Sequence, residues 1–261
     1  YVTNVNEPPV ITTNGGNATS TNYTENGLGS VIDINSTDDA GNETAGLTYS
    51  LSGADAGKFN INSNTGIITW KASPDYETPG DIGTDNIYNL TITVTDAGGL
   101  TDTIGLSVTV TNVNDNSPVL TVVNVCVPEN TTSVETVSAT DADSGDSMVF
   151  SISGTDASLF TINSGTGVLS FISAPDFEAP GDAGANNIYD FSVRVTDGAG
   201  HFDTKLISVT VTNVNDNSPV LTASNVNVAE NTTSVETVSA TDTDSGDSKT
   251  FSISGADASL F

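Results

Sequence analysis

Basic residues are almost missing from this chain of 261 residues, which holds five Lys and Arg against 33 Asp and Glu, for a formal net charge of −28. Nucleic acids are bound through clustered basic side chains, so this balance excludes nucleic acid as a partner. It also argues against docking on an anionic membrane surface. Because five cations cannot pair with 33 carboxylates, the other acids must be solvated or neutralised by cations from outside the chain.

Cysteine and histidine are equally scarce, with one of each. The single cysteine, Cys126, excludes an internal disulfide framework. One cysteine and one histidine are also too few ligands for a zinc or copper site. No run of 18 apolar residues is present, so we expect no direct membrane insertion. The content of Val, Ile, Leu and Phe is nevertheless high enough for a packed core, unlike that of disordered acidic segments.

An internal repeat organises the sequence. The stretch SVTVTNVNDNSPVLT occurs at residues 107–121 and again, unchanged, at 208–222, an offset of 101 residues. ENTTSVETVSATD returns with the same offset at 129–141 and 230–242, and looser copies lie upstream. We expect the end of a preceding repeat at 1–9, repeats at 10–111 and 119–212, linkers at 112–118 and 213–219, and a partial repeat at 220–261. This phase suggests a segment of a longer protein.

Hydrophobic residues alternate with polar ones inside each repeat. In residues 187–196, Tyr189, Phe191, Val193 and Val195 take every second position, which is typical of a half-buried strand. Turn residues separate similar runs at 134–139, 148–153, 168–172 and 206–212. About seven short strands in about 100 residues predict an all-β chain of tandem seven-stranded Greek-key β-sandwiches.

Acidic residues lie at the ends of these predicted strands. Glu129 precedes one strand, Asp141 and Asp143 follow it as a D-x-D pair, and Asp176 and Glu178 form a D-x-E pair. In extended chain, residues two apart point the same way, so each pair directs two carboxylates to one place. Left bare at about 4 Å, with an effective dielectric constant of about 20, two such charges repel by about 4 kcal/mol. A hard cation such as Ca²⁺, which prefers carboxylate, amide and carbonyl oxygens, reverses that cost, and the Asn-rich linker supplies all three.

These motifs together carry a family resemblance. Glu-Asn before a strand, D-A-D after it, D-F-E, V-T-D-G and N-V-N-D-N-x-P at the boundary occur in this order at the repeat spacing. The set resembles tandem cadherin repeats, in which each joint between domains holds calcium. Three features depart from the animal pattern: the linkers begin with Asn112 and Asn213 instead of Asp, the first repeat reads DDAGN at 38–42, and the loops at 79–81 and 180–182 read P-G-D. The P-G-D loops resemble those of bacterial cadherin-like repeats.

The resemblance implies a calcium-ligand set at two joints. For the first joint it comprises Glu25, Asp75, Glu77, Asn112, Asn114, Asp115, Asn116, Asp141, Asp143 and Asp197. For the second joint it comprises Glu129, Asp176, Glu178, Asn213, Asn215, Asp216, Asn217, Asp242 and Asp244. The predicted set also includes Asp96, the counterpart of Asp197 in the first repeat.

Other residues have simpler interpretations. The only tryptophan, Trp70, aligns with Phe171 inside a strand and is expected in the core, whereas Cys126 is expected to point outward and His201 to face solvent in a turn. Paired acids also serve glycoside hydrolysis, but a catalytic pair would occur once, not in every repeat, so we expect no enzyme.

The sequence therefore predicts a calcium-rigidified extracellular segment of a bacterial-type surface adhesin or stalk, at the cell surface or secreted. An alternative is a structural subunit of a surface layer or filament, whose partial third repeat is completed by a neighbouring chain. A third is an accessory spacer in a secreted enzyme. The expected partners are calcium ions, with other copies of the protein or a cell-surface ligand left open.

Overall fold

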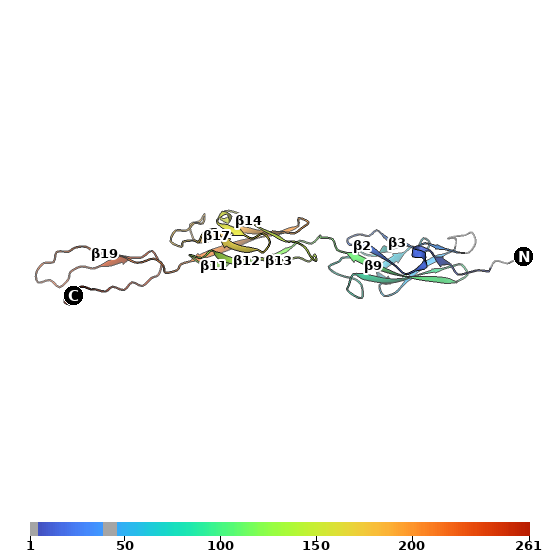
Figure 1. Ribbon diagram of the computed structural model, residues 1–261, viewed down its shortest axis with the longest axis horizontal. Helices are drawn as coiled ribbons and strands as arrows, with labels where there is room; N and C mark the ends of the chain where they lie inside the picture. The colour runs from blue at the N-terminus through green and yellow to red at the C-terminus, as the bar shows by residue number, and fades with distance from the viewer. Residues whose placement is uncertain (1–4, 39–45) are drawn as a thin grey trace. The chain divides into compact units, whose positions relative to one another are not determined.

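The computed structural model describes residues 5–38 and 46–261 and divides into two compact units (Figure 1). Unit 1 is Tyr1–Asn116 with Ala142–Asp146, and unit 2 is Ser117–Asp141 with Ser147–Phe261. Residues 1–4 of the predicted preceding repeat and residues 39–42 of the DDAGN loop lie outside the described part. Within that part, no helix has the length and apolar character needed to cross a membrane.

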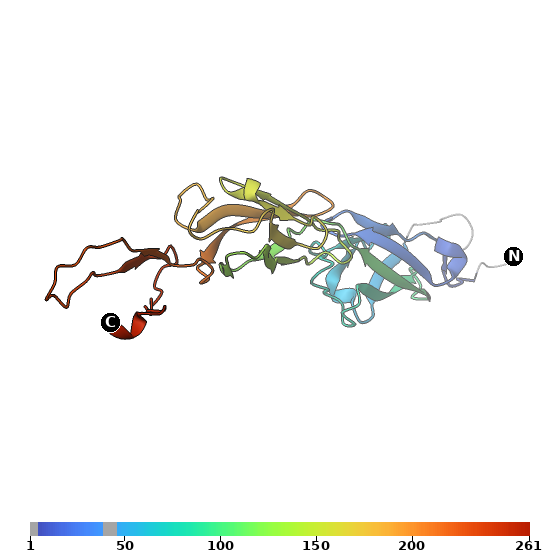
Figure 2. The same ribbon diagram turned by 60° about the vertical axis from the view of Figure 1, so that its left-hand side comes forward.

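Repeat 1, in unit 1, is built from two facing sheets (Figure 2). The larger sheet has the order β2 (Thr19–Thr24), β9 (Thr101–Thr111), β8 (Ile87–Thr95) and β5 (Thr48–Ser52). The other side has β3 (Ser30–Asp33), β7 (Ile67–Trp70) and β6 (Phe59–Ile61), with the short pair β1 (Val10–Ile11) and β4 (Ser36–Thr37). Two 3₁₀ turns, η1 (Thr13–Gly16) and η2 (Ala56–Lys58), interrupt the strands.

Repeat 2, in unit 2, has the same arrangement. One sheet has the order β11 (Val125–Pro128), β18 (Phe202–Thr212), β17 (Ile188–Thr196) and β14 (Val149–Ser153). The other side has β12 (Ser133–Thr136), β16 (Val168–Phe171) and β15 (Phe160–Ile162), with the pair β10 (Val119–Thr121) and β13 (Ser138–Thr140), and η3 (Ala157–Leu159) precedes β15. Because the first and second strands of each repeat are both interrupted, nine segments make seven strands. The predicted all-β class and tandem sandwiches are confirmed.

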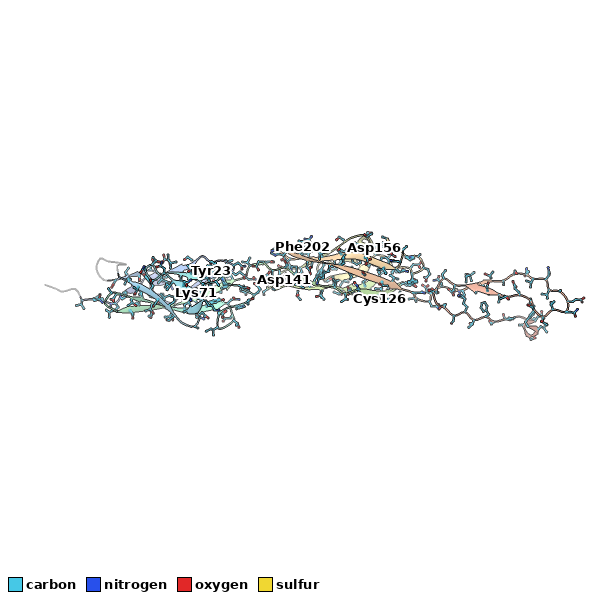
Figure 3. The ribbon with its side chains drawn as sticks, turned by 180° about the vertical axis from the view of Figure 1, so that it is seen from behind. Tyr23, Lys71, Cys126, Asp141, Asp156 and Phe202 are labelled. Atoms are coloured by element: carbon cyan, nitrogen blue, oxygen red, sulfur yellow. The ribbon has the colours of Figure 1, made fainter. Side chains whose placement is uncertain are left out.

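The cores follow the alternation of the sequence. Tyr189, Phe191, Val193 and Val195 are all 2% exposed or less and point between the two sheets of repeat 2. Trp70 is buried in the core of repeat 1, with its ring centroid 4.1 Å from that of Phe59. Its predicted core position is confirmed, as is the outward position of Cys126 on β11 (Figure 3).

The partial third repeat shows how much a strand depends on its partner. It holds one short pair, β19 (Val220–Thr222) and β20 (Ser239–Thr241), and the turn η4 (Ala258–Leu260). Leu221 is 59% exposed, whereas its counterpart Leu120 in repeat 2 is fully buried. The identical sequence that forms β12 in repeat 2 forms no strand here, because no counterpart of its partner β16 is among the described residues.

Some carboxylates are part of the sandwich itself. Asp81 is buried and accepts hydrogen bonds from the backbone N–H groups of Asp85 (3.1 Å) and Asn86 (3.1 Å). Asp55 accepts them from Ile82 (2.9 Å) and Asn89 (2.8 Å). Burial alone would raise the pKa of Asp81, but the backbone donors outweigh it and hold that pKa below its ordinary value of 3.8. These acids need no cation, because main-chain donors satisfy them.

Asp81→Asn should lower the free energy of unfolding of repeat 1 at pH 7 by about 1–3 kcal/mol, because the amide turns a donor toward backbone donors. A lowered pKa in the folded state means that the carboxylate stabilises the fold above pH 3.8 and loses this effect as the pH falls through its folded pKa. The deficit of the variant should therefore shrink in acid. Urea unfolding followed by the fluorescence of Trp70, the only tryptophan, measures repeat 1 alone.

Asp85→Asn is the matched control, because repeat 2 carries Asn186 at the equivalent position with the same hydrogen bond to the backbone two residues on. Equal stability of the two variants at pH 7 would show that the Asp81 carboxylate contributes nothing.

Candidate metal centres

Three carboxylates from distant parts of the sequence meet at one end of the repeat 1 sandwich. Glu25 follows β2, Glu77 lies in the loop after β7, and Asp115 lies in the linker after β9; one oxygen from each lies within 4.8 Å of the other two. The pairing of strands explains the meeting. Since β2 runs parallel to β9, with Thr24 opposite Thr111, the residues after both strands emerge at the same edge.

The same geometry recurs in unit 2. Glu129, Glu178 and Asp216 bring one oxygen each within 4.8 Å of one another. Here β11 runs parallel to β18, with Pro128 opposite Thr212. Parallel pairing of the first and last strands therefore places a carboxylate group at the same end of both repeats.

The glutamate after the first strand is held rigidly by main-chain donors. Glu25 is 4% exposed, and its Oε2 and Oε1 accept hydrogen bonds from the N–H groups of Tyr76 (2.6 Å) and Val113 (2.7 Å). Glu129 is bound in the same way by Phe177 and Val214, at 2.8 Å and 2.7 Å. Each glutamate thus ties the D-x-E loop of its repeat to the following linker.

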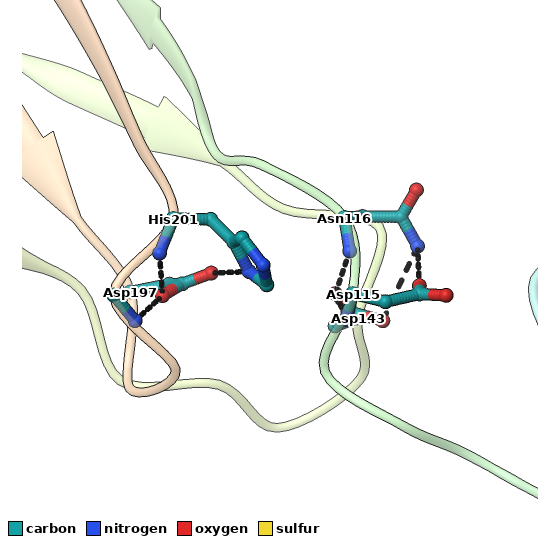
Figure 4. A network of polar contacts seen from close by, with 6 residues as sticks. Asp115, Asn116, Asp143, Asp197 and His201 are labelled. Atoms are coloured by element: carbon teal, nitrogen blue, oxygen red, sulfur yellow. Dashed lines mark hydrogen bonds and ion pairs between the residues drawn. The ribbon is translucent and has the colours of Figure 1, made fainter.

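The linkers are held by a second aspartate. In unit 1, Oδ2 of the buried Asp143 accepts hydrogen bonds from the backbone N–H groups of Asp115 (3.1 Å) and Asn116 (2.8 Å), and Nδ2 of Asn116 donates to Oδ1 of Asp143 at 3.3 Å (Figure 4). In unit 2, Asn217 donates hydrogen bonds to the Asp244 carboxylate from its backbone N–H (2.8 Å) and from Nδ2 (3.1 Å). These contacts fix the backbone of the repeated N-D-N sequence.

Several oxygens around these groups are buried and accept no hydrogen bond from the described residues. In unit 1 they are Glu77 Oε1, Asn112 Oδ1 and Asn114 Oδ1, and in unit 2 they are Glu178 Oε1 and Asn213 Oδ1. A buried acceptor without a donor costs about 1–3 kcal/mol. All five belong to the predicted ligand set, and all are oxygen donors that suit a hard cation.

Like charges crowd the same places. Burial, followed by the charges of Glu25 and Asp143, raises the pKa of Glu77 to about 7. Burial and the charges of Glu129, Asp244 and Asp176 likewise raise the pKa of Glu178. In the absence of a cation, each group therefore disfavours its own ionisation.

A further acidic group lies in the third repeat, where Asp242, Asp244 and Asp247 bring one oxygen each within 4.8 Å of one another. Asn215 donates a hydrogen bond from Nδ2 to Asp247. Asp247 is absent from the predicted set. The sequence could have indicated it, because DTDSGD at 242–247 and DADSGD at 141–146 both place a third acid after the D-x-D pair and a Ser-Gly turn.

Other predicted residues lie apart from the three groups. Oδ1 of the exposed Asp75 accepts a hydrogen bond from Thr78 N–H at 3.0 Å, and Oδ1 of Asp176 accepts from Glu178 and Ala179 at 3.0 and 3.1 Å. The side chains of Asp75 and Asp176 thus accept hydrogen bonds from backbone N–H groups within their own loops.

Asp96 lies at the opposite end of repeat 1, because β8 runs antiparallel to β9. There its Oδ2 accepts a hydrogen bond from Asn6 Nδ2 at 2.7 Å, which ties it to the upstream linker. Asp141 follows β13 and is half-buried.

Asp197 has a contact that sequence reasoning missed. Its Oδ2 lies 2.9 Å from Nδ1 of His201, and its Oδ1 accepts hydrogen bonds from the N–H groups of Gly200 (2.5 Å) and His201 (2.7 Å) (Figure 4). Burial alone would raise the pKa of Asp197, but these contacts lower it. The His201 side chain is 40% exposed, so the turn residue expected to face solvent also contacts a predicted ligand.

Comparison with known proteins identifies the family of the chain. The Cadherin domain family matches residues 20–111 and 123–212. Human Protocadherin Fat 1 is 35% identical over 233 residues, covering 84% of this chain and 5% of its own length. The chain thus spans a small part of this curated relative.

Two solved structures show the same fold. Human CDH23 EC21-23 has a TM-score of 0.71 at 20% identity, covering 92% of this chain and 81% of that one. The protocadherin gammaB7 EC3-6 cis-dimer has a TM-score of 0.64 at 26% identity, covering 91% of this chain and 56% of that one.

Proposed function

The chain belongs to the cadherin family, and from that premise we propose that its acidic groups are calcium sites that stiffen the linkers of an extracellular adhesion protein. Tandem cadherin repeats of an adhesion family are established by the family match over residues 20–111 and 123–212. The calcium, its ligands and the stiffening are the proposal.

One observation carries the proposal: the set of buried oxygens that accept no hydrogen bond from the described residues. Glu77 Oε1, Asn112 Oδ1 and Asn114 Oδ1 are buried atoms of half-buried residues that accept no hydrogen bond from the described residues, whereas the buried Asp81 accepts two from backbone donors. Ca²⁺ takes six to eight such oxygens in flexible geometry. Zinc and copper fit poorly, since the chain has one His and one exposed Cys.

The residues of the chain have distinct parts in such a site. The glutamates after the first strand, Glu25 and Glu129, position the D-x-E loop and the linker through backbone hydrogen bonds. Asp143 and Asp244 hold the N-D-N backbone. A bound calcium ion would supply positive charge to carboxylates that otherwise repel, and the unused oxygens of Glu77 and Glu178 would face it.

Stiffening follows from the composition of the linker. Residues 213–219 are mainly Asn, Asp, Ser and Pro and form no core of their own. Their polar contacts run to Glu129 on one side and to Asp244 on the other. When like charges at both ends are neutralised by shared ions, the linker loses freedom to move; without the ions it should behave as a flexible segment.

Several finer assignments remain predictions. The P-G-D loops favour a bacterial-type adhesin or stalk, whereas the matched relatives include human and mouse proteins. Self-association is supported by the cis-dimer among the structural relatives, and a surface-layer or filament role has no observation of its own in favour. An extracellular location is proposed for the chain because structural relatives are described as extracellular cadherin domains.

Glu77→Gln should weaken calcium binding at least tenfold, because it removes one charge and keeps the size of the side chain. Isothermal titration calorimetry of the full chain should give dissociation constants of about 10⁻⁴ to 10⁻³ M for the wild type, as in extracellular modules. Asp85→Asn removes one charge from an exposed loop of the same repeat and should bind calcium as the wild type does. Absence of heat in the wild type, or equal binding by Glu77→Gln, contradicts the proposal.

Chelation should expose the second linker to protease while leaving the sandwiches folded. We expect cleavage within residues 213–217 to accelerate at least tenfold in EDTA, because the linker gains freedom, and the β signal in circular dichroism to change little. The exposed turn at 163–166, which lies apart from the acidic groups, is the control and should be cut equally in both states. If EDTA melts the β signal, the ions support the repeats themselves and the stiffening account is wrong.

A further inference from the structure

Repeat 1 carries a pocket that its proposed calcium sites do not use. The pocket has a volume of about 250 Å³ and lies between the end of η2, the end of β7, the loop at 72–80 and the start of β8. Trp70 and Tyr88 line it from the core, and Lys58 and Lys71 line it from the surface. Two of the five basic residues of the chain therefore border one small cavity.

The two lysines lie opposite each other just beyond the paired ends of β6 and β7, Lys58 as the last residue of η2 and Lys71 directly after β7. Phe59 pairs with Trp70, and Lys71 N–H donates to the Lys58 carbonyl at 2.9 Å, so the next pair along the strands is Lys58 and Lys71. Like charges in directly opposite positions are destabilising. Yet among the described residues neither ammonium lies within 4.0 Å of a carboxylate, in a chain with 33 acids. The Lys71 ammonium donates one hydrogen bond, to Gly57 O at 2.9 Å.

A buried hydroxyl meets one of these charges inside the pocket. Tyr88 Oη accepts a hydrogen bond from Gly80 N–H at 2.9 Å, and the hydroxyl also carries a proton of its own to donate. A methyl group placed on Gly80 would lie 3.3 Å from Tyr88 Oη and 3.4 Å from Lys58 Nζ. The two donors therefore both border the position beside the Gly80 Cα, where even a methyl group would be a tight fit.

Repeat 2 shows that the fold does not require this charge. Its equivalent pocket, of about 400 Å³, is lined by Leu159, Phe171 and Ile172 in place of Lys58, Trp70 and Lys71. The backbone hydrogen bond between the opposed residues is kept, from Ile172 N–H to Leu159 O at 2.9 Å. An apolar pair thus occupies the same position in repeat 2, so the fold itself does not explain the lysine pair of repeat 1.

We propose that the repeat 1 pocket binds the carboxylate of an acidic sugar unit. Two ammonium groups and a phenol proton match the oxygens of one carboxylate. The rim also holds Asp75, Ser73 and Thr78, which are suited to sugar hydroxyl groups and would not favour a simple inorganic anion. The buried rings of Trp70 and Tyr88, 5% and 2% exposed, close the pocket on its inner side. Asp75 also belongs to the calcium-ligand set that the family resemblance implies, although it lies outside the three acidic groups.

The single tryptophan makes the proposal directly measurable, because Trp70 lines this pocket and no other residue contributes indole fluorescence. Titration of the full chain with glucuronic acid at constant ionic strength should give a saturable change in Trp70 fluorescence, with a millimolar dissociation constant. Glucose, which has the same ring without the carboxylate, and inorganic phosphate should each bind at least tenfold more weakly.

Lys58→Leu with Lys71→Ile copies the pocket of repeat 2 and should reduce glucuronate affinity at least tenfold. Both side chains are exposed, and unchanged thermal unfolding would show that the variant is folded. Lys58→Arg with Lys71→Arg keeps the charge and should bind within threefold of the wild type.

Because glucuronate also binds calcium, the titration is run with and without EDTA. The fluorescence of Trp70 should change in both cases. Equal responses to glucose and glucuronate, equal competition by phosphate, a response only with calcium present, or full binding by the Leu/Ile variant would each overturn the proposal.

Discussion

The burial of like-charged oxygens at the ends of strands is the constraint on which the rest of this structure depends. Parallel pairing of the first strand with the last, β2 with β9 and β11 with β18, delivers a glutamate and a linker aspartate to the same edge of each sandwich. With five basic residues in the chain, these carboxylates find no protein cation. The fold thus builds places of concentrated negative charge that an external cation would neutralise.

The chain separates two kinds of buried acid by the donors around them. Asp81 and Asp55 sit in loops whose backbone N–H groups saturate both carboxylate oxygens, so they stabilise the loops without metal. Glu77 instead keeps a buried oxygen without a donor and has a pKa raised to about 7, chiefly by burial. Asp81 and Asp55 thus differ from Glu77 in the number of backbone donors, whereas Glu25 and Glu129 combine two backbone donors with a place in an acidic group.

Much of the fold could be predicted from the sequence, because period-two alternation and repeat spacing are local signals. The alternation at 187–196 identifies the buried face of β17, and the alignment with Phe171 places Trp70 in a core.

What a strand does without its partner could not be predicted: ENTTSVETVSATD includes β12 in repeat 2 but forms no equivalent strand in the third repeat. The hydrogen bond from Thr78 N–H to Asp75 was also hidden, because it depends on the turn of the loop. The opposed lysines, 13 residues apart in sequence, become neighbours only through the register of β6 and β7.

The central claim is that the donor-free oxygens are calcium ligands, and anomalous diffraction from crystals grown in calcium tests it most directly. The account predicts anomalous peaks within about 2.3–2.6 Å of Glu77 Oε1 and of the Asn112 and Asn114 Oδ1 atoms, the range of Ca–O bonds in proteins. Equivalent peaks are expected at Glu178 Oε1 and Asn213 Oδ1 in unit 2. If saturating calcium left these oxygens hydrogen-bonded to ordered water, with no anomalous density beside them, the account would be contradicted.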